Sequence, residues 1–303
     1  MAVPILSRED VELIVPNCKV FSSSLHGGQK LVFPCLISDV KCAIKFILIN
    51  NEDSNGEEEE FSNSEEIINR AKRELSIMRR VSSPNIIKLG DIDLTQIDYK
   101  GQALIYYSEE WIDGNDVGSI LKESRVMSII DTLKLVRDIT KAIDCIWNEG
   151  NVHRDIKPQN IMRKTIDNTY VLLDLGIAFD IKDVSLTSIG CIVGTRTYVS
   201  PEQLDLKNKR SIDFRSDLFS LGVVMYQALT GKHPFYEKGM TEPEIFTKIL
   251  TETPMAPMEL DSNIPSGVNE IVMRLLNKRP YARYKKCSIL IDDIEAIIRA
   301  LEV

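Results

Sequence analysis

The spacing of apolar residues changes near residue 110, and this change limits the fold more than any other feature of the chain. Before it, residues 30–37 and 40–49 are apolar and β-branched, and the polar pair Ser38-Asp39 between them predicts a β-hairpin. After it, apolar residues recur at helical spacing, and residues 128–150 are predicted to form a long amphipathic helix. Strands followed by helices predict an α+β fold.

The same pattern predicts two lobes. The first, about residues 1–110, is small and rich in strands, and the second, about residues 115–303, is larger and mainly helical. A chain of 303 residues is long enough to give two such lobes a sizeable core.

Residues 50–66, NNEDSNGEEEEFSNSEE, form an acidic segment with almost no apolar residues. Such a composition predicts a solvated loop, and a docking site for a basic partner is the alternative. A helix is predicted to begin near Glu65, because apolar residues then recur about every 3.6 positions. The residues on this apolar face are Ile67, Ile68, Ala71, Leu75 and Met78.

Composition argues against several other classes of protein. The formal charge of −8 is unfavourable for general nucleic-acid binding, which usually needs a basic face. No apolar run reaches the roughly 18 residues of a membrane span, and the start MAVPILSRED lacks the basic region of a signal peptide. We therefore expect a cytoplasmic protein. The six cysteines show no CxxC pair, so neither a disulfide framework nor a zinc site is predicted.

Residues 152–162, VHRDIKPQNIM, place an acid, a base and an amide within six positions. These are Asp155, Lys157 and Asn160, and the later DLG segment adds Asp174. Phosphoryl transfer needs this set: a carboxylate to orient a hydroxyl, a cation for the moving phosphoryl group, and oxygen ligands for a metal. Mg²⁺ prefers such hard oxygen ligands together with phosphate oxygens.

In these segments the chain resembles the eukaryotic-type protein kinases, and most of all the bacterial Ser/Thr protein kinases. Eight segments in the family's order, from about residue 17 to 300, make an accidental match very improbable. The segments are CAIK, KREL, EEWIDG, HRDIKPQN, DLG, GTRTYVSPEQ, SDLFSLGVVMYQALTGKHPF and KRPYAR. The resemblance implies one bilobal kinase domain over residues 1–303, with a small β-rich N-lobe and a larger α-helical C-lobe.

The resemblance also implies an ATP site. Lys45 in CAIK matches the lysine that holds the α- and β-phosphates, and Glu74 in KREL matches the helix glutamate that pairs with it. Glycines in SSSLHGGQK match a loop whose backbone N–H groups approach the phosphates closely. The residues implied to bind ATP are Gly27, Gly28, Val32, Ala43, Lys45, Glu110 and Met162.

In the second lobe the resemblance implies that Asp155 accepts the proton of the substrate hydroxyl and that Lys157 steadies the γ-phosphate. Asn160 and Asp174 match the ligands of Mg²⁺, or of Mn²⁺ in its place. The positions implied to be structural are Thr195, which contacts the catalytic aspartate, the ion pair of Glu202 with Arg283, and Asp217, which holds the catalytic loop backbone.

Three positions of the first lobe depart from the family pattern. Leu25 and Lys30 replace glycines of the phosphate loop, and Lys30 is predicted to be a solvated strand residue rather than a charge near the phosphates. Glu109 stands before the hinge, where an apolar residue or threonine is usual. A buried carboxylate there is costly unless it is paired, so either Glu109 has a polar partner or the alignment is shifted by one residue.

Control of the enzyme is expected to lie in the segment between Asp174 and Glu202. Arg154 precedes the catalytic aspartate, and a phosphate on Thr187 is predicted to pair with it and order the segment. Protein substrates bearing Ser or Thr are expected, with self-association for autophosphorylation in trans.

Two other functions compete with an active Ser/Thr protein kinase. The weakened glycine loop and Glu109 favour a nucleotide-binding pseudokinase that acts as a scaffold. A phosphotransferase acting on small molecules ranks last, because such enzymes generally lack the SPE segment and the helix with Asp217.

Overall fold

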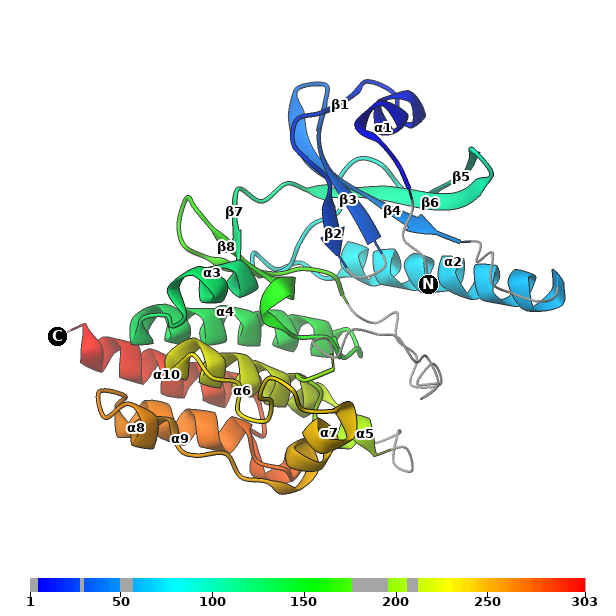
Figure 1. Ribbon diagram of the computed structural model, residues 1–303. Helices are drawn as coiled ribbons and strands as arrows, with labels where there is room; N and C mark the ends of the chain where they lie inside the picture. Colours follow the sequence, from blue (N-terminus) through cyan, green and yellow to red (C-terminus); the bar gives the residue numbers. More distant parts are fainter. Residues whose placement is uncertain (1–4, 28–29, 50–56, 176–195, 206–211, 303) are drawn as a thin grey trace. The chain divides into compact units, whose positions relative to one another are not determined.

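The computed structural model describes residues 5–27, 30–49, 57–175, 196–205 and 212–302. The chain forms two compact units, which are drawn in Figure 1. The first unit consists of Met1–Arg80 and Ile87–Ile112, and the second consists of Val81–Ile86 and Asp113–Val303. A large sheet organises the first unit, and helices organise the second.

The described strands of the first unit form a six-stranded antiparallel sheet in the order β1-β3-β4-β6-β5, with β2 also paired to β3. The predicted hairpin is confirmed, because β3 and β4 pair along their length. Ser38 and Asp39 connect them with φ angles of 49° and 66°, as a tight two-residue hairpin turn requires. The strands are β1 (Cys18–Val20), β2 (Leu25–Gly27), β3 (Lys30–Ile37), β4 (Val40–Leu48), β5 (Thr95–Tyr99) and β6 (Gln102–Glu110).

Helix α1 (Arg8–Ile14) covers one face of this sheet. Its N-terminus is capped by Ser7, which accepts a hydrogen bond from the Asp10 backbone N–H while the Asp10 carboxylate accepts one from Ser7 N–H. Leu31 and Phe46 are buried on this face together with Val11 of the helix. Burying these apolar side chains fixes which residues of β3 and β4 must point the other way.

Helix α2 (Glu57–Arg80) covers the opposite face (Figure 1). Ile47 and Tyr107 of the sheet enter this second core. Lys30 is the strand partner of Ile47, and Lys45 is the partner of Tyr107, so both lysines belong to the face that α2 covers. The side chains that α2 contributes to the core are Ile67, Ala71 and Leu75.

The prediction of an acidic loop through residue 66 is wrong for its second half. Helix α2 begins at Glu57, eight positions before the expected start at Glu65, whereas residues 50–56 lie outside the described part of the chain. Glutamate has a good intrinsic helix propensity and is favoured near a helix N-terminus. The acidic residues therefore extend the helix that is anchored by packing further along.

The second unit is mainly helical. Helix α6 is buried on nearly all sides and packs against α4 and α9, while α10 packs against α4. Helix α4 ends as predicted near Gly150, whose φ of 75° suits glycine. The small sheet of the unit consists of β7 (Gly114–Asp116), β8 (Ile161–Lys164) and β9 (Tyr170–Leu172). The helices and 3₁₀ turns are α3 (Val117–Ser124), α4 (Ile129–Asn148), η1 (Pro158–Asn160), α5 (Pro201–Leu204), α6 (Phe214–Thr230), α7 (Glu242–Thr251), α8 (Pro257–Leu260), α9 (Ser266–Leu275), η5 (Pro280–Ala282) and α10 (Cys287–Leu301).

Gly222 lets α6 and α9 approach closely. A Cβ atom at this position would lie 2.7 Å from the Leu275 Cβ, which is closer than real Cβ atoms approach one another. We expect Gly222→Ala to lower the free energy of unfolding by roughly 1–2 kcal/mol, because overpacking outweighs the better helix propensity of alanine. Urea denaturation measures the change.

Gly267→Ala is the matched control for this substitution. There an added Cβ would meet the Ile297 Cδ1 at 3.2 Å, and the end of a flexible side chain can move aside. Equal stability of Gly222→Ala and Gly267→Ala would show that the two helices separate without cost.

Candidate active site

Lys45 and Glu109 form a buried ion pair in the first unit. The Lys45 Nζ lies 2.8 Å from Glu109 Oε1 and 2.7 Å from Oε2, and the two side chains are 6% and 3% exposed. Ala43 is the strand partner of Glu109, and Tyr107 is the partner of Lys45, so the two charges are diagonal neighbours on one face of the sheet. Of the two explanations for Glu109, the structure supports a polar partner, which is Lys45.

Glu74 of α2 pairs with Lys30. The Lys30 Nζ donates to Glu74 Oε1 at 3.0 Å and Oε2 at 3.2 Å, and also to the Tyr107 hydroxyl at 3.2 Å. This corrects two expectations, since the predicted partner of Glu74 was Lys45 and Lys30 was predicted to be solvated. Lys30 is only partly exposed, and Glu74 is buried.

Strand register explains the exchange of partners. Lys30 and Lys45 lie on the same face but in neighbouring rows, with Lys45 opposite Val32 and Lys30 opposite Ile47. Glu109 is one diagonal step from Lys45, so it provides the nearest buried carboxylate on the sheet itself. The carboxylate from α2 is then matched by the second lysine of the face. Two buried acids and two lysines thus balance in charge.

Apart from Gly28, the other residues expected to bind ATP occupy defined positions in the described part of each unit. Val32 and Ala43 share the face that carries Lys45, since their strand partners are Lys45 and Glu109. Gly27 is the strand partner of Lys30 at the end of β2, whereas Gly28 lies outside the described residues. The Glu110 carboxylate accepts a hydrogen bond from the Lys88 backbone N–H at 3.0 Å.

Met162 belongs to the second unit and is partly buried. It lies on β8, where its strand partners are Asp116 on β7 and Val171 on β9. Met162 follows Asn160 by two residues in the sequence. The small sheet therefore fixes Met162 at the end of the segment that carries the expected catalytic residues.

In the second unit, Asp155, Lys157 and Asn160 converge. The Lys157 Nζ lies 2.7 Å from Asp155 Oδ2, and Asn160 Nδ2 donates to the backbone oxygen and to Oδ2 of Asp155, both at 2.9 Å. Lys157 is extended, with φ of −154°, as expected for a residue before proline, and Pro158 opens the turn η1 that brings Asn160 back. The carboxylate of Asp155 is thereby held by an ammonium group and an amide.

Asp217 of α6 holds the backbone of this segment. Its two carboxylate oxygens accept hydrogen bonds from the backbone N–H groups of His153 and Arg154, each at 2.8 Å. Burial raises the pKa of Asp217, and these hydrogen bonds with the nearby positive charges oppose the rise. Arg154 has a φ of 69°, so the segment turns through a backbone conformation that few residues other than glycine adopt.

Leu173, which directly precedes Asp174, is linked to the backbone of Asn160, the other residue expected to bind a metal. Its backbone N–H donates to the Asn160 carbonyl at 2.8 Å, and its carbonyl lies 3.2 Å from His153 Nε2. Asp174 follows directly, partly exposed and with a φ of 46°. One amide and one carboxylate fit Mg²⁺, which usually takes few protein ligands and several water or phosphate oxygens. No cluster of three or more His, Cys, Asp or Glu ligands occurs among the described residues.

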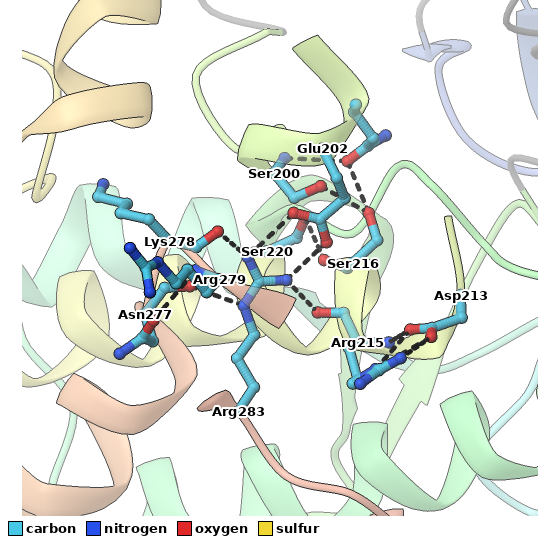
Figure 2. Close-up of polar contacts among 11 residues, drawn as sticks. Ser200, Glu202, Asp213, Arg215, Ser216, Ser220, Asn277, Lys278, Arg279 and Arg283 are labelled. Carbon is cyan, nitrogen blue, oxygen red and sulfur yellow. Dashed lines mark hydrogen bonds and ion pairs between the residues drawn. The ribbon is translucent and has the colours of Figure 1, made fainter. Parts of the chain in front are cut away.

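Glu202 and Arg283 form an ion pair in the second unit, which Figure 2 shows in close-up. Arg283 Nη1 donates to Glu202 Oε1 at 2.6 Å, and Nη2 donates to Oε2 at 3.0 Å. The remaining hydrogen bonds of this fully buried arginine go to the backbone carbonyls of Arg215, Asn277 and Lys278. A bidentate pair with satisfied donors is the arrangement in which a buried charge is tolerated.

Gln203 is a positioning residue that sequence reasoning missed. Its side-chain amide donates to the Arg154 carbonyl at 3.0 Å, and its oxygen accepts from Ser200 N–H at 2.9 Å. The segment after Ser200 is thus connected to the backbone next to Asp155. The capping pattern of Ser200 with Gln203 three positions later was a usable signal. Thr187 and Thr195, singled out from the sequence, lie outside the described residues.

Comparison with known proteins identifies the class. A model of the protein kinase domain matches residues 27–293. The chain belongs to the protein kinase family, which confirms both the resemblance and the α+β kinase fold.

The curated relatives are serine/threonine-protein kinases of bacteria. The probable serine/threonine-protein kinase CPE1738 of Clostridium perfringens is 31% identical over 239 residues, which are 79% of this chain and 33% of that protein. PknB of Mycobacterium leprae is 30% identical over 226 residues, 74% of this chain and 35% of PknB. PknA of Mycobacterium tuberculosis is 30% identical over 238 residues, 78% of this chain and 53% of PknA.

The match thus spans about a third of the first two relatives and about half of the third. Among the helices that the structure describes, none is both long and apolar enough to cross a membrane.

Proposed function

We propose that this chain transfers the γ-phosphate of ATP to Ser or Thr hydroxyls of proteins, its own included. The observation that carries the proposal is the Asp155, Lys157 and Asn160 cluster, held by two backbone hydrogen bonds to Asp217. Positioning of this kind is most of what an enzyme supplies to phosphoryl transfer. Membership in the kinase family and the names of the bacterial relatives support the same reaction.

Each side chain has a task in this reaction. Asp155 orients the attacking hydroxyl and accepts its proton, since it is a partly exposed carboxylate. Lys157 balances negative charge on the transferred phosphoryl group. Asn160 and Asp174 would hold Mg²⁺, which supplies charge neutralisation at the phosphate oxygens when bound. Asp217 keeps the segment in place by accepting hydrogen bonds from its backbone.

Regulation by the segment after Asp174 is part of the proposal. Phosphate on Thr187 would add negative charge that Arg154 can bind. Arg154 is already fixed through its backbone by Asp217 and Gln203, so a phosphate contact at its guanidinium would be coupled to the backbone beside Asp155. Mass-spectrometric mapping of phosphate tests this point directly.

The experiment that tests the function is phosphate transfer from labelled ATP. Purified protein is incubated with Mg²⁺, alone and with a generic basic protein, and Asp155→Asn purified in parallel controls for contaminating kinases. We expect label on Ser and Thr of wild-type samples and none with EDTA. A parallel assay offers small-molecule acceptors, and label on these alone would indicate a different phosphotransferase. Nucleotide binding without transfer to any acceptor would indicate a pseudokinase.

A further inference from the structure

We propose that a basic surface between α9 and α10 binds the acidic end of helix α2 from a second copy of this chain. The basic surface consists of the exposed side chains of Arg274, Arg279, Lys285 and Lys286. The acidic end of α2 is Glu57–Glu65, the first part of that helix. Association of two copies goes beyond the proposed function, and it is measured without ATP.

The basic surface comes from a stretch of concentrated positive charge. Six of the 13 residues from Arg274 to Lys286 are Lys or Arg, and none is Asp or Glu. The whole chain, by contrast, holds 37 basic and 45 acidic residues. The nearest acids along the chain, Glu270 and Asp292, lie on either side of the stretch. An acidic protein thus carries one strongly basic place, which can attract an acidic partner.

Contacts inside the second unit bring the two ends of this stretch together. Buried Arg283 donates hydrogen bonds to the two backbone carbonyls that precede Arg279. The guanidinium carbon of Arg274 lies 4.0 Å from the ring centroid of Tyr284, which is buried and directly precedes Lys285. The four exposed cations therefore come from neighbouring stretches of backbone and form one surface.

None of these four cations forms an ion pair with a carboxylate in the described part of the chain. Other exposed cations do, as Arg8 does with Glu12 at 3.1 Å. Arg279 instead donates to the hydroxyl of Tyr281 at 2.7 Å, and Tyr281 is 63% exposed. An exposed aromatic ring beside cations suits a protein partner, because tyrosine and arginine are enriched at protein interfaces.

The opposite charge occurs in the first unit of the same chain. The acidic end of α2 holds five glutamates and no basic residue. A contact between the basic surface of one copy and the acidic end of another pairs opposite charges, which favours association and fixes its orientation. Because the two surfaces belong to different units, a symmetric pair of copies would make the contact twice.

The test is sedimentation velocity over a range of protein concentrations, at low and at high salt. One variant, Lys285→Glu/Lys286→Glu, reverses two charges of the basic surface, and another, Glu59→Lys/Glu60→Lys, reverses two charges of the acidic end of α2. Lys286 directly precedes α10, so a glutamate there meets the favourable end of the helix dipole and should not disturb the fold.

Wild type should associate as its concentration rises, and high salt should weaken this association. Each charge-reversed variant alone should associate about 10- to 100-fold more weakly, because repulsion replaces attraction. A 1:1 mixture of the two variants should recover association, since the acidified surface of one then meets the basic helix end of the other. Lys232→Glu/Lys238→Glu is the control and should behave as wild type, because it reverses two exposed lysines outside the basic surface.

Three results would overturn the inference: wild type that stays monomeric at every concentration in low salt, variants that associate as well as wild type, or a mixture that fails to recover association. Flotation with phosphatidylglycerol vesicles adds one more. Vesicle binding by wild type that Lys285→Glu/Lys286→Glu loses, without self-association, would assign the basic surface to an anionic membrane instead. None of these measurements involves ATP, so their failure would leave the proposed function standing.

Discussion

An Asp155→Asn variant is expected to transfer phosphate about 10³-fold more slowly than wild type, within the range that a positioned general base contributes. Asparagine has the same shape and still offers an oxygen to Lys157 and Asn160, which both contact Asp155 Oδ2. It cannot accept the proton of the substrate hydroxyl. The chemical step should therefore fail while the arrangement around it survives.

Single-turnover transfer from labelled ATP measures this rate, and calorimetry measures nucleotide affinity in the same samples. Asp167→Asn is the control, since Asp167 is an exposed aspartate in the connection between β8 and β9. It should behave as wild type. If Asp155→Asn retained a tenth of the wild-type rate or more, Asp155 would not be the base, and transfer would depend on positioning alone.

The sequence could place three side chains of the second unit close together because the relevant geometry is local. Asp155, Lys157 and Asn160 lie within six positions, and Pro158 between them restricts the backbone to the turn that makes them converge. The contact of Glu202 with Arg283 joins residues 81 positions apart. Nothing in local spacing indicates it, and only the family resemblance placed those two residues together.

The charges of the first unit could not be assigned in the same way. Which lysine pairs with Glu74 depends on how β3, β4 and β6 are aligned and on how helix α2 lies over them. Alternation gave a usable signal, because Leu31 is buried on the face of α1 and Lys30 must then point toward α2. Glu109 is a second buried acid, and it needs a second cation as its partner. That requirement was the signal in the sequence that one lysine pairs with Glu109 and the other with Glu74.

The start of α2 shows a different limit. Apolar periodicity detects only the part of a helix that packs, which here begins near Ile67. The residues from Glu57 to Glu66 have no apolar stripe, so their composition resembled a loop. Helix propensity adds little for each residue, but a helix that is already nucleated by packing extends at low cost. Acidic segments next to a packed helix are therefore easily mistaken for loops.

Lys45→Met is expected to lower the free energy of unfolding by about 3–5 kcal/mol, the usual effect of removing one partner from a buried ion pair. The loss arises from Glu109, whose carboxylate would remain in the interior without the cation that contacts both of its oxygens. Urea denaturation without nucleotide measures this effect separately from ligand binding.

The double variant Lys45→Met/Glu109→Leu should recover most of that stability, since replacing a buried pair with apolar residues of similar size is often neutral. Arg8→Met, which breaks the exposed pair with Glu12 on α1, serves as the control and should change stability far less. A double variant as unstable as Lys45→Met would mean that Lys45 stabilises the sheet through its own packing. Recovery would instead show that the cost of Lys45→Met lies in the loss of the Lys45 ammonium group from the Glu109 carboxylate, and that the pair can be removed from the first unit without loss of its fold.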